Sequence, residues 1–410
     1  MIYIGIDWSD ESHSICILDE IGDKLTAFTI AHGQAGFEMA HSRICKYAAS
    51  PQDACVAIET KDSLLADFLL ELGYSLHFLN PKQTDRFRDR HRMSGAVSDG
   101  FDAYVLADAV RTDQHLFNAL CALDEQSLTL RVLTRTREGL VQRKVAISNE
   151  LTSALKRYFP LAVELFGGLD NPEAIDFLLQ YPTFAQAKTV SQARIHSIIK
   201  KHGVSDKVAA RRSASILDKL KEPQPTPAAN IAQAYPMAVK SLLRQMRNVL
   251  DELKAIEEQI RVCYNDHPNK ELLESLPGVA STLGAVLAAE LGADMSRFAD
   301  IKTLKAHAGS SPVTKQSGKY REIRYRRACN WRIRQALHLA SRSAINCCGW
   351  AREIYDKQRS QGKSYGRALR AVADQLIEMI YVILTRRTPY NEAYHLQMKA
   401  RYLEKETVLT

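Results

Sequence analysis

The first 112 residues carry an order of apolar segments that few folds can satisfy. Three short apolar runs, at residues 2–6, 14–18 and 24–30, are separated by turns of a few residues, which predicts an antiparallel meander. Helical and strand-like segments then alternate, so the predicted order is β-β-β-α-β-α-β-α, an α/β domain. The alternating segments are helices at residues 36–49, 62–72 and 99–111 and strands at residues 54–60 and 75–80.

Four acidic residues fall at the ends of these predicted elements. Asp7 ends the first strand, and Glu59 ends the apolar fourth strand. Asp99 and Asp102 are three residues apart at the start of a helix that Ser98 is expected to cap, so they share one helix face. In this order the first strand pairs with the fourth and the last helix packs across them. We therefore expect three separate segments to bring four carboxylates to one place.

A group of four carboxylates needs cations, and oxygen ligands favour Mg²⁺ or Mn²⁺. Two such ions about 3.5–4 Å apart would activate an attacking oxygen and stabilise a leaving oxygen in phosphoryl transfer. Simpler interpretations exist for single residues: Asp7 is also compatible with a turn, and Asp99 with a favourable charge in a first helical turn. The joint placement of the four favours a metal-dependent nuclease site.

Two long helices are predicted in the middle of the chain, the first over residues 128–159. The second has apolar residues that step by three and four, as in a coiled coil. These residues are Val239, Leu242, Met246, Val249, Leu253, Ile256 and Ile260. An intramolecular helical hairpin, a dimer seam and plain core packing are all compatible with this stripe. Residues 160–235 are mixed, and their three closely spaced prolines, Pro223, Pro225 and Pro227, are typical of a linker.

Most of the net charge lies in one segment. The formal net charge is +8, and residues 312–342 contain a single acid, Glu322. The nine basic residues there are Lys315, Lys319, Arg321, Arg324, Arg326, Arg327, Arg332, Arg334 and Arg342. A basic cluster inside a foldable segment indicates a polyanion partner, although a solvated charged face is the simpler alternative. Tyr320, Tyr325 and Trp331 lie among these cations and could stack on bases or belong to the core.

The C-terminal part is predicted to be a compact helical domain from about residue 270. Pro277 and Gly278 separate two predicted helices, as in a helix-hairpin-helix that holds a phosphate with backbone N–H groups. A plain helical hairpin fits equally well. Residues 309–319 follow as a predicted loop rich in hydroxyls and cations, and it contains Ser317 before Gly318. Lys315, Lys319, Arg321 and Arg324 could neutralise a phosphodiester at the Ser317 hydroxyl, but a serine before a glycine is most often only a turn.

Several classes of protein are excluded by composition. No stretch approaches the roughly 18 apolar residues of a membrane span. The eight cysteines include no CxxC pair, so neither a disulfide framework nor a zinc site is predicted. The N-terminal residues lack the basic start of a signal peptide. We expect a reduced, cytoplasmic protein with no membrane partner.

Together these residues resemble the DEDD insertion-sequence transposases of the IS110 group, also described as bridge-RNA-guided recombinases. At the N-terminal end the resemblance rests on Gly5-Ile6-Asp7, Ile58-Glu59, Asn80-Pro81 and Ser98-Asp99-x-x-Asp102-Ala103. At the C-terminal end it rests on Leu276-Pro277-Gly278-Val279, Arg297-Phe298, Ala308-Gly309-x-x-Pro312, Ser317-Gly318, Asn330-x-x-Ile333-Arg334-x-x-Leu337 and the segment from Arg367 to Tyr381. The order and spacing of these motifs are specific, although no single motif is.

The resemblance implies an RNase H/RuvC-like domain at residues 1–122, a helical coiled-coil-like region at 123–268 and a basic DNA-binding transposase domain at 269–410. It implies that Asp7, Glu59, Asp99 and Asp102 bind Mg²⁺ or Mn²⁺ and that Ser317 attacks DNA. It also implies as partners the double-stranded DNA of the element ends and target, a structured guide RNA, and further copies of the chain in a dimer or tetramer. One departure is Val97, where the family usually has lysine.

The predicted function is to cut and rejoin DNA so that an insertion sequence moves, with the acids and Ser317 meeting at one composite site. Two alternatives remain at this point. One is a metal-dependent nuclease or Holliday-junction resolvase that hydrolyses DNA, in which Ser317 is only a turn. The other is a non-catalytic nucleic-acid-binding protein with structural acids.

Overall fold

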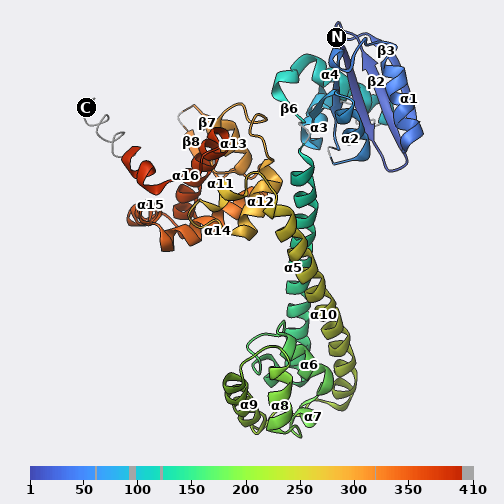
Figure 1. Cartoon of the computed structure of the whole chain (residues 1–410). Helices are drawn as coiled ribbons and strands as arrows, with labels where there is room; N and C mark the ends of the chain where they lie inside the picture. The colour runs from blue at the N-terminus through green and yellow to red at the C-terminus, as the bar shows by residue number, and fades with distance from the viewer. Residues whose placement is uncertain (61, 92–97, 121–122, 319, 399–410) are drawn as a thin grey trace. The chain divides into compact units, whose positions relative to one another are not determined.

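The computed structural model describes residues 1–410 except 61, 92–97, 121–122, 319 and 399–410. Val97 and Lys319 therefore lie outside the described residues. The chain divides into two compact units, Met1–Leu123 and Asp124–Thr410 (Figure 1).

The first unit is built on a six-stranded sheet with the order β3-β2-β1-β4-β5-β6. The predicted meander is confirmed, because β1 pairs antiparallel with β2 and β2 with β3. The predicted pairing of the first and fourth strands is confirmed as well, and β1, β4 and β5 run parallel. The strands are β1 (Ile2–Trp8), β2 (Ser12–Leu18), β3 (Lys24–Ala31), β4 (Ala54–Ile58), β5 (Ser75–Phe78) and β6 (Asn118–Ala119).

Four α-helices accompany the strands in the described part of this unit: α1 (Gln34–Ile44), α2 (Leu64–Glu71), α3 (Pro81–His91) and α4 (Asp99–Asp113). The sequence predicts a strand at residues 75–80 and no helix between it and the helix at residues 99–111. That interpretation was incomplete, because Pro81 is the first residue of α3. Proline suits this position, since a first-turn residue needs no N–H donor and its fixed φ is already helical.

The second unit contains two long helices that pack along each other, α5 (Glu125–Tyr158) and α10 (Ala229–Asn265) (Figure 1). Asp124 caps α5 by accepting a hydrogen bond from the Ser127 N–H. Their apolar faces enter two separate cores. Leu151 and Met246 belong to the core shared with the intervening helices, whereas Leu130 and Ile260 belong to the core of the C-terminal part. Of the alternatives predicted for the apolar stripe of residues 239–260, the structure shows the intramolecular helical hairpin.

The segment between the two long helices folds into four short helices around Phe159 and Phe177. These are α6 (Pro172–Gln180), α7 (Phe184–Ala187), α8 (Gln192–Lys200) and α9 (Asp206–Leu220). Residues 223–228, which include the three clustered prolines, form no helix or strand.

The C-terminal part packs helices around a core that includes Leu287, Leu337 and Leu376. Gly278 lies in the turn between the first two helices with φ 80°, and a Cβ there would lie 2.3 Å from the Ala340 carbonyl oxygen. Only glycine therefore permits this turn to lie so close to the helix at Trp331–Cys347, α14. The helices are α11 (Lys270–Glu274), α12 (Ser281–Leu291), α13 (Ile301–Ala308), α14 (Trp331–Cys347), α15 (Gly349–Ser360) and α16 (Tyr365–Arg386).

The predicted loop at residues 309–319 was wrong in its second half. Residues there form an antiparallel hairpin of β7 (Val313–Ser317) and β8 (Tyr320–Arg324). Its side chains are almost all exposed and polar, so the apolar alternation that usually reveals a strand is missing. Among the described residues, no helix is both long and apolar enough to cross a membrane.

Candidate active site and nucleic-acid interface

The sheet register places Asp7 and Glu59 at the same edge of the first unit. Ile6 on β1 pairs with Ile58 on the parallel β4, and the two acids follow these residues directly. Parallel neighbouring strands end side by side, so Asp7, the last residue but one of β1, and Glu59, the first residue after β4, lie at adjacent positions of this edge. Asp99 and Asp102 lie in the first turn of α4. Asp102 is buried, whereas Asp99 is exposed.

Gly5 in β1 has no side chain, and this allows α4 to pack directly against the strand. A Cβ at Gly5 would lie 1.9 Å from the Ala103 carbonyl oxygen and 2.4 Å from the Ala107 nitrogen. Helix α4 therefore lies directly on β1, which any larger residue at position 5 would prevent. Ala103 is the neighbour of Asp102, and Gly5 is two residues from Asp7. The close approach at Gly5 thus brings the acids of α4 to the end of β1.

The charges at this edge act strongly on Asp7. Its pKa rises from 3.8 to about 6, first because of burial and then because of the negative charges of Asp102, Asp99 and Glu59. The structure therefore brings the four predicted acids within electrostatic reach of one another. The edge carries an excess of negative charge that a bound cation would relieve.

Arg88 on α3 partly supplies that cation. Its Nε donates to Asp102 Oδ1 at 2.8 Å, its Nη1 donates to Asp85 Oδ1 at 2.8 Å, and its charge lowers the pKa of Asp7. Arg88 is not among the predicted site residues, because no helix is predicted there from the sequence. A signal was present: Asp85 and Arg88 have the i, i+3 spacing of a helical ion pair.

The donor set fits a divalent metal ion. Carboxylate oxygens are the ligands that hard divalent cations prefer. Within the described residues, no three His, Cys, Asp or Glu side chains are already arranged around a single ion position. Arg88 on Asp102 agrees with this, since it occupies an oxygen that a metal would use.

Ser317 lies at the tip of the β7–β8 hairpin, where it pairs with Tyr320. Its side chain is exposed, and the following Gly318 has φ 55°, as a tight hairpin turn requires. Side chains alternate along a strand, so Lys315 and Glu322 share the face of Ser317. Glu322 accepts hydrogen bonds from Tyr320 Oη at 2.9 Å and Arg324 Nε at 2.6 Å.

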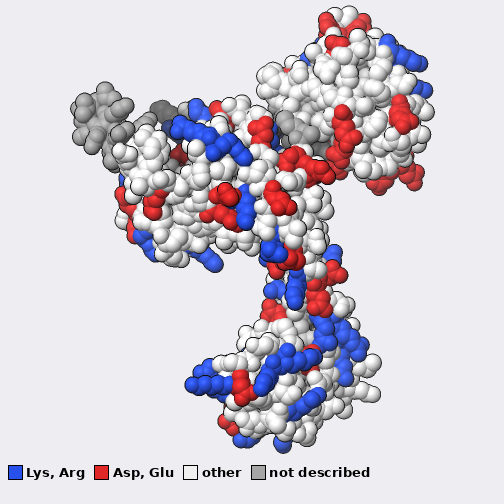
Figure 2. Space-filling view, viewed as in Figure 1, with Lys and Arg blue, Asp and Glu red and all other residues white. Residues whose placement is uncertain are grey.

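The predicted nucleic-acid-binding cations differ in their exposure and in whether another group of the protein already binds them. Lys315, Arg321 and Arg327 are exposed, whereas Arg324 is bound to Glu322 and Arg332 Nε donates to Glu138 Oε2 at 2.7 Å. Figure 2 shows Lys and Arg gathered over the part of the second unit that carries the hairpin. The remaining members are held by main-chain contacts: Arg326 donates to the Ser311 carbonyl and Arg334 to the Arg326 carbonyl.

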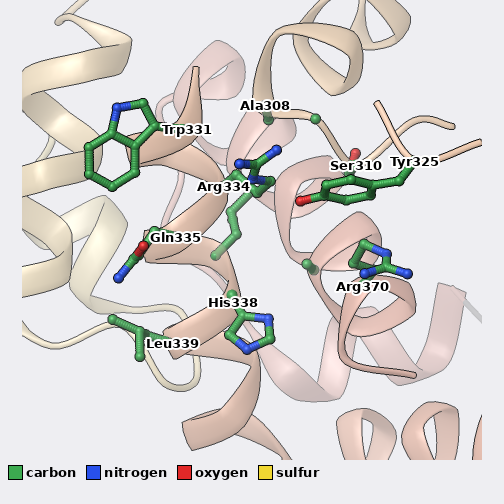
Figure 3. A pocket seen from close by; sticks show the side chains of 12 residues that line it. Ala308, Ser310, Tyr325, Trp331, Arg334, Gln335, His338, Leu339 and Arg370 are labelled. Carbon is green, nitrogen blue, oxygen red and sulfur yellow. The ribbon is translucent and has the colours of Figure 1, made fainter. Parts of the chain in front are cut away.

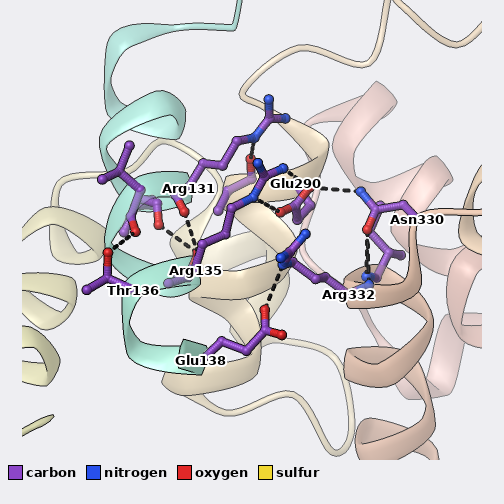
Figure 4. A network of polar contacts seen from close by, with 12 residues as sticks. Arg131, Arg135, Thr136, Glu138, Glu290, Asn330 and Arg332 are labelled. Atoms are coloured by element: carbon purple, nitrogen blue, oxygen red, sulfur yellow. Dashed lines mark hydrogen bonds and ion pairs between the residues drawn. The ribbon is translucent and has the colours of Figure 1, made fainter. Parts of the chain in front are cut away.

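A hydrogen-bond network around the buried carboxylate of Glu290 lies at the start of α14 (Figure 4). Glu290 on α12 is 1% exposed and accepts hydrogen bonds from Arg135 Nε at 3.2 Å and Asn330 Nδ2 at 2.8 Å. Burial raises the pKa of Glu290, but the Asn330 and Arg135 hydrogen bonds outweigh burial and the pKa is lowered. Asn330 also caps α14 by accepting from the N–H groups of Arg332 and Ile333. The network joins α5, α12 and α14.

Comparison with known proteins agrees with both ends of the chain. Residues 4–160 match the DEDD-type IS110 transposase model, described as transposase, and residues 270–356 match the transposase IS116/IS110/IS902 family. The chain is 30% identical over 402 residues to the mini-circle putative transposase for IS117 of Streptomyces coelicolor, covering 95% of each. It is 35% identical over 204 residues to the putative transposase y4uE of Sinorhizobium fredii, covering 49% of this chain and 57% of that protein.

With one transposase region at residues 4–160 and a second at residues 270–356, the chain belongs to the IS110-type family of DEDD transposases. Its class is therefore an enzyme that acts on DNA in the transposition of an insertion sequence. The family implies dependence on a divalent metal. This assignment excludes the alternative of a non-catalytic binding protein.

Proposed function

We propose that this transposase cuts and rejoins DNA through a covalent phosphoserine at Ser317, with Asp7, Glu59, Asp99 and Asp102 as holders of Mg²⁺ or Mn²⁺. The observation that carries the proposal is the concentration of negative charge at the end of β1. The pKa of Asp7 is raised to about 6, first by burial and then by the charges of three neighbouring acids, and bound cations would stabilise the charged carboxylates.

The four carboxylates would hold the metal ions, and Arg88 would release Asp102 when they bind. Divalent cations at such a site supply Lewis-acid polarisation of a phosphoryl oxygen and make a hydroxyl more acidic. Asp102 is buried and fixed by α4, Asp7 lies within β1 and pairs with Ser14 of β2, and Glu59 follows β4 directly. These three residues therefore form the rigid part of the donor set, and the exposed Asp99 completes it.

Ser317 would attack the phosphorus of a DNA phosphodiester. A bond forms between Ser317 Oγ and phosphorus, the bond from phosphorus to one DNA oxygen breaks, the serine loses its proton and the leaving DNA hydroxyl gains one. The exposed cations of the hairpin, Lys315 and Arg321, would neutralise the phosphate. Attack by another DNA hydroxyl reverses these bond changes, so rejoining needs no external energy source.

The described residues of the hairpin supply no free base for Ser317. Glu322 is on the same face, but its carboxylate is bound to Arg324 and Tyr320, and these hydrogen bonds lower its pKa. A serine hydroxyl is a weak nucleophile unless a base or metal activates it. The carboxylates of the first unit therefore act in the same reaction as Ser317, in our proposal.

The proposed partners are the double-stranded DNA of the element ends and target, a structured guide RNA, and one or three further copies of the chain. Reaction at two DNA ends requires at least two active sites. In this proposal the α5–α10 pair is a coiled coil, and the turn at Gly278 is a helix-hairpin-helix contact to a DNA backbone.

The test is denaturing electrophoresis of labelled element-end DNA after reaction with wild type, Ser317→Ala and Ser311→Ala. Ser311 is a matched control, since it precedes the same hairpin. We expect a protein–DNA adduct with wild type and Ser311→Ala but none with Ser317→Ala. The second candidate, a hydrolytic nuclease or Holliday-junction resolvase, is favoured by the place of Ser317 in a tight turn. Cleavage by Ser317→Ala at nearly the wild-type rate, without an adduct, would establish that candidate instead.

A further inference from the structure

A small pocket lies beside the hairpin in the C-terminal part of the second unit (Figure 3). Its volume is about 290 Å³, which is at the small end for ligand sites and suits one nucleotide-sized group. Four structural elements contribute to it. Ser310 follows α13, Tyr325 follows β8, Trp331, Arg334 and His338 come from α14, and Arg370 comes from α16.

The pocket concentrates positive charge. The guanidinium carbons of Arg334 and Arg370 lie 5.0 and 4.8 Å from the centre of the Tyr325 ring. Arg334 donates to the Arg326 carbonyl oxygen and Cys329 Sγ, and within the described residues neither arginine is paired with a carboxylate. The pKa of His338 is lowered, first by burial and then by the charges of Arg370 and Arg342.

The half-buried guanidinium groups of Arg334 and Arg370 would be stabilised by a bound anion. Arginines that lose water are normally paired with carboxylates, since an unpaired charge in such surroundings is costly. The ring of Tyr325 offsets part of this cost through cation–π contact. A phosphate carries negative charge and can accept hydrogen bonds from two guanidinium groups at once. An aromatic ring offers neither a full charge nor such hydrogen bonds.

The same pocket exposes two large aromatic side chains. Tyr325 is 43% exposed and Trp331 is 38% exposed. Stacking on exposed aromatic rings is how proteins hold bases that have left a duplex, and it works for any base. Arginines and aromatic rings therefore converge here in the combination that a phosphate and a base require.

We propose that this pocket captures a single unstacked nucleotide of a nucleic-acid strand, with Arg334 and Arg370 on its phosphate and Trp331 against its base. The proposal rests on the family's action on DNA and not on the role proposed for Ser317. Strand β8 separates the two places: Ser317 is at the tip of the hairpin and Tyr325 at its base, roughly 15 Å apart at the rise of a β-strand. The pocket would hold the strand a few nucleotides from the phosphate that Ser317 attacks.

The test uses the full-length protein in EDTA, so that no cleavage is needed. Affinities for short oligothymidylate, oligouridylate and a duplex of equal length are measured by fluorescence anisotropy for wild type, Arg370→Gln and Arg367→Gln. Arg367 is the matched control, because it is exposed on α16 one turn before Arg370 and outside the pocket. We expect Arg370→Gln to weaken single-strand binding by roughly tenfold, and Arg367→Gln by less than about twofold.

A second measurement keeps the test independent of folding defects in the arginine variant. Bound bases should quench the fluorescence of Trp331, and Trp331→Phe should remove that quenching while Trp8 and Trp350 remain. The proposed nucleotide site would be contradicted if Arg370→Gln and Arg367→Gln bound the single strands with equal affinity, or if Trp331→Phe showed unchanged quenching. Tighter binding of oligothymidylate assigns the nucleotide to DNA and tighter binding of oligouridylate assigns it to RNA. Ser317→Ala should retain the quenching, so failure of the serine mechanism is seen separately.

Discussion

The carboxylate edge of the first unit and the serine hairpin of the second position their chemistry in opposite ways. At the edge, helix α4 lies so close to β1 that Gly5 has no space for a side chain, and Asp102 is buried. At the hairpin, Ser317 and Gly318 are exposed, and a Cβ on Gly318 would meet nothing within 4 Å. Packing therefore fixes the acids, while only local backbone geometry fixes the serine. Substitutions should have global effects in the first region and local effects in the second.

The largest effect is expected from the acids themselves. Asp7→Asn, Glu59→Gln or Asp102→Asn should each lower the rate of DNA cleavage by roughly a thousandfold or more, because each removes a ligand for the proposed metal ions. EDTA should abolish cleavage by wild type, and Mg²⁺ or Mn²⁺ should restore it. The measurement is the rate of strand cleavage at fixed DNA occupancy, with thermal unfolding as a check on the fold. Asp7→Asn should be at least as stable as wild type in EDTA, since it removes like-charge repulsion. Full activity in EDTA would contradict the metal assignment.

The next effect tests the close packing. Gly5→Ala should destabilise the first unit by about 3 kcal/mol or more, because its Cβ would overlap the α4 backbone. Urea denaturation followed by circular dichroism measures the change. Gly100→Ala is the matched control: Gly100 is also in α4, and a Cβ there meets nothing within 4 Å. That control should be neutral or slightly stabilising. Equal stability of the two variants would mean that α4 does not depend on Gly5.

The third prediction concerns the buried carboxylate of Glu290 in the second unit, the unit that carries the Ser317 hairpin. Glu290→Gln should cost about 2–4 kcal/mol at pH 7, because it leaves Arg135 without its buried carboxylate. The pKa of Glu290 is lowered in the folded state, so its contribution is present above the unfolded value of about 4.5 and is lost as the pH falls through the folded value. Wild type should therefore lose stability below about pH 4.5 more steeply than Glu290→Gln. Denaturation curves at several pH values give both slopes, and parallel slopes would contradict the role of Glu290.

The smallest effect is expected at the hairpin tip. Gly318→Ala should cost about 1 kcal/mol, because an L-residue at φ 55° is strained but not obstructed. The change should appear as faster hydrogen exchange of the β7–β8 amides, by roughly fivefold, with exchange in the first unit unchanged. Gly318→Asn should be milder, since asparagine adopts this conformation more readily. A loss of global stability as large as that of Gly5→Ala would remove the contrast between the two regions.

Apolar spacing along the chain was enough to predict the parts of the molecule that depend on local periodicity. The three-strand meander, the parallel fourth strand and the two long helices follow from apolar spacing within single segments. The acids were predictable because Asp7 lies near the end of such a strand, Glu59 follows another, and Asp99 and Asp102 lie in the first turn of a helix, although the Ser98 side chain does not cap that helix as expected. The apolar face of residues 239–260 predicted a partner helix, although it left open whether that partner belonged to the same chain.

Tertiary structure alone decided the features that link distant polar residues. Helix α3 and Arg88 escaped detection because α3 is almost wholly polar, and Thr84 is its one buried residue. The β7–β8 hairpin has no apolar alternation, so its strands exist through cross-strand hydrogen bonds that no local pattern encodes. The Glu290 network and the Arg334–Tyr325–Arg370 pocket join residues that are far apart in the sequence and belong to separate elements. Charge and hydrogen-bond partners are chosen by proximity in the fold, and apolar periodicity within one element carries no information about them.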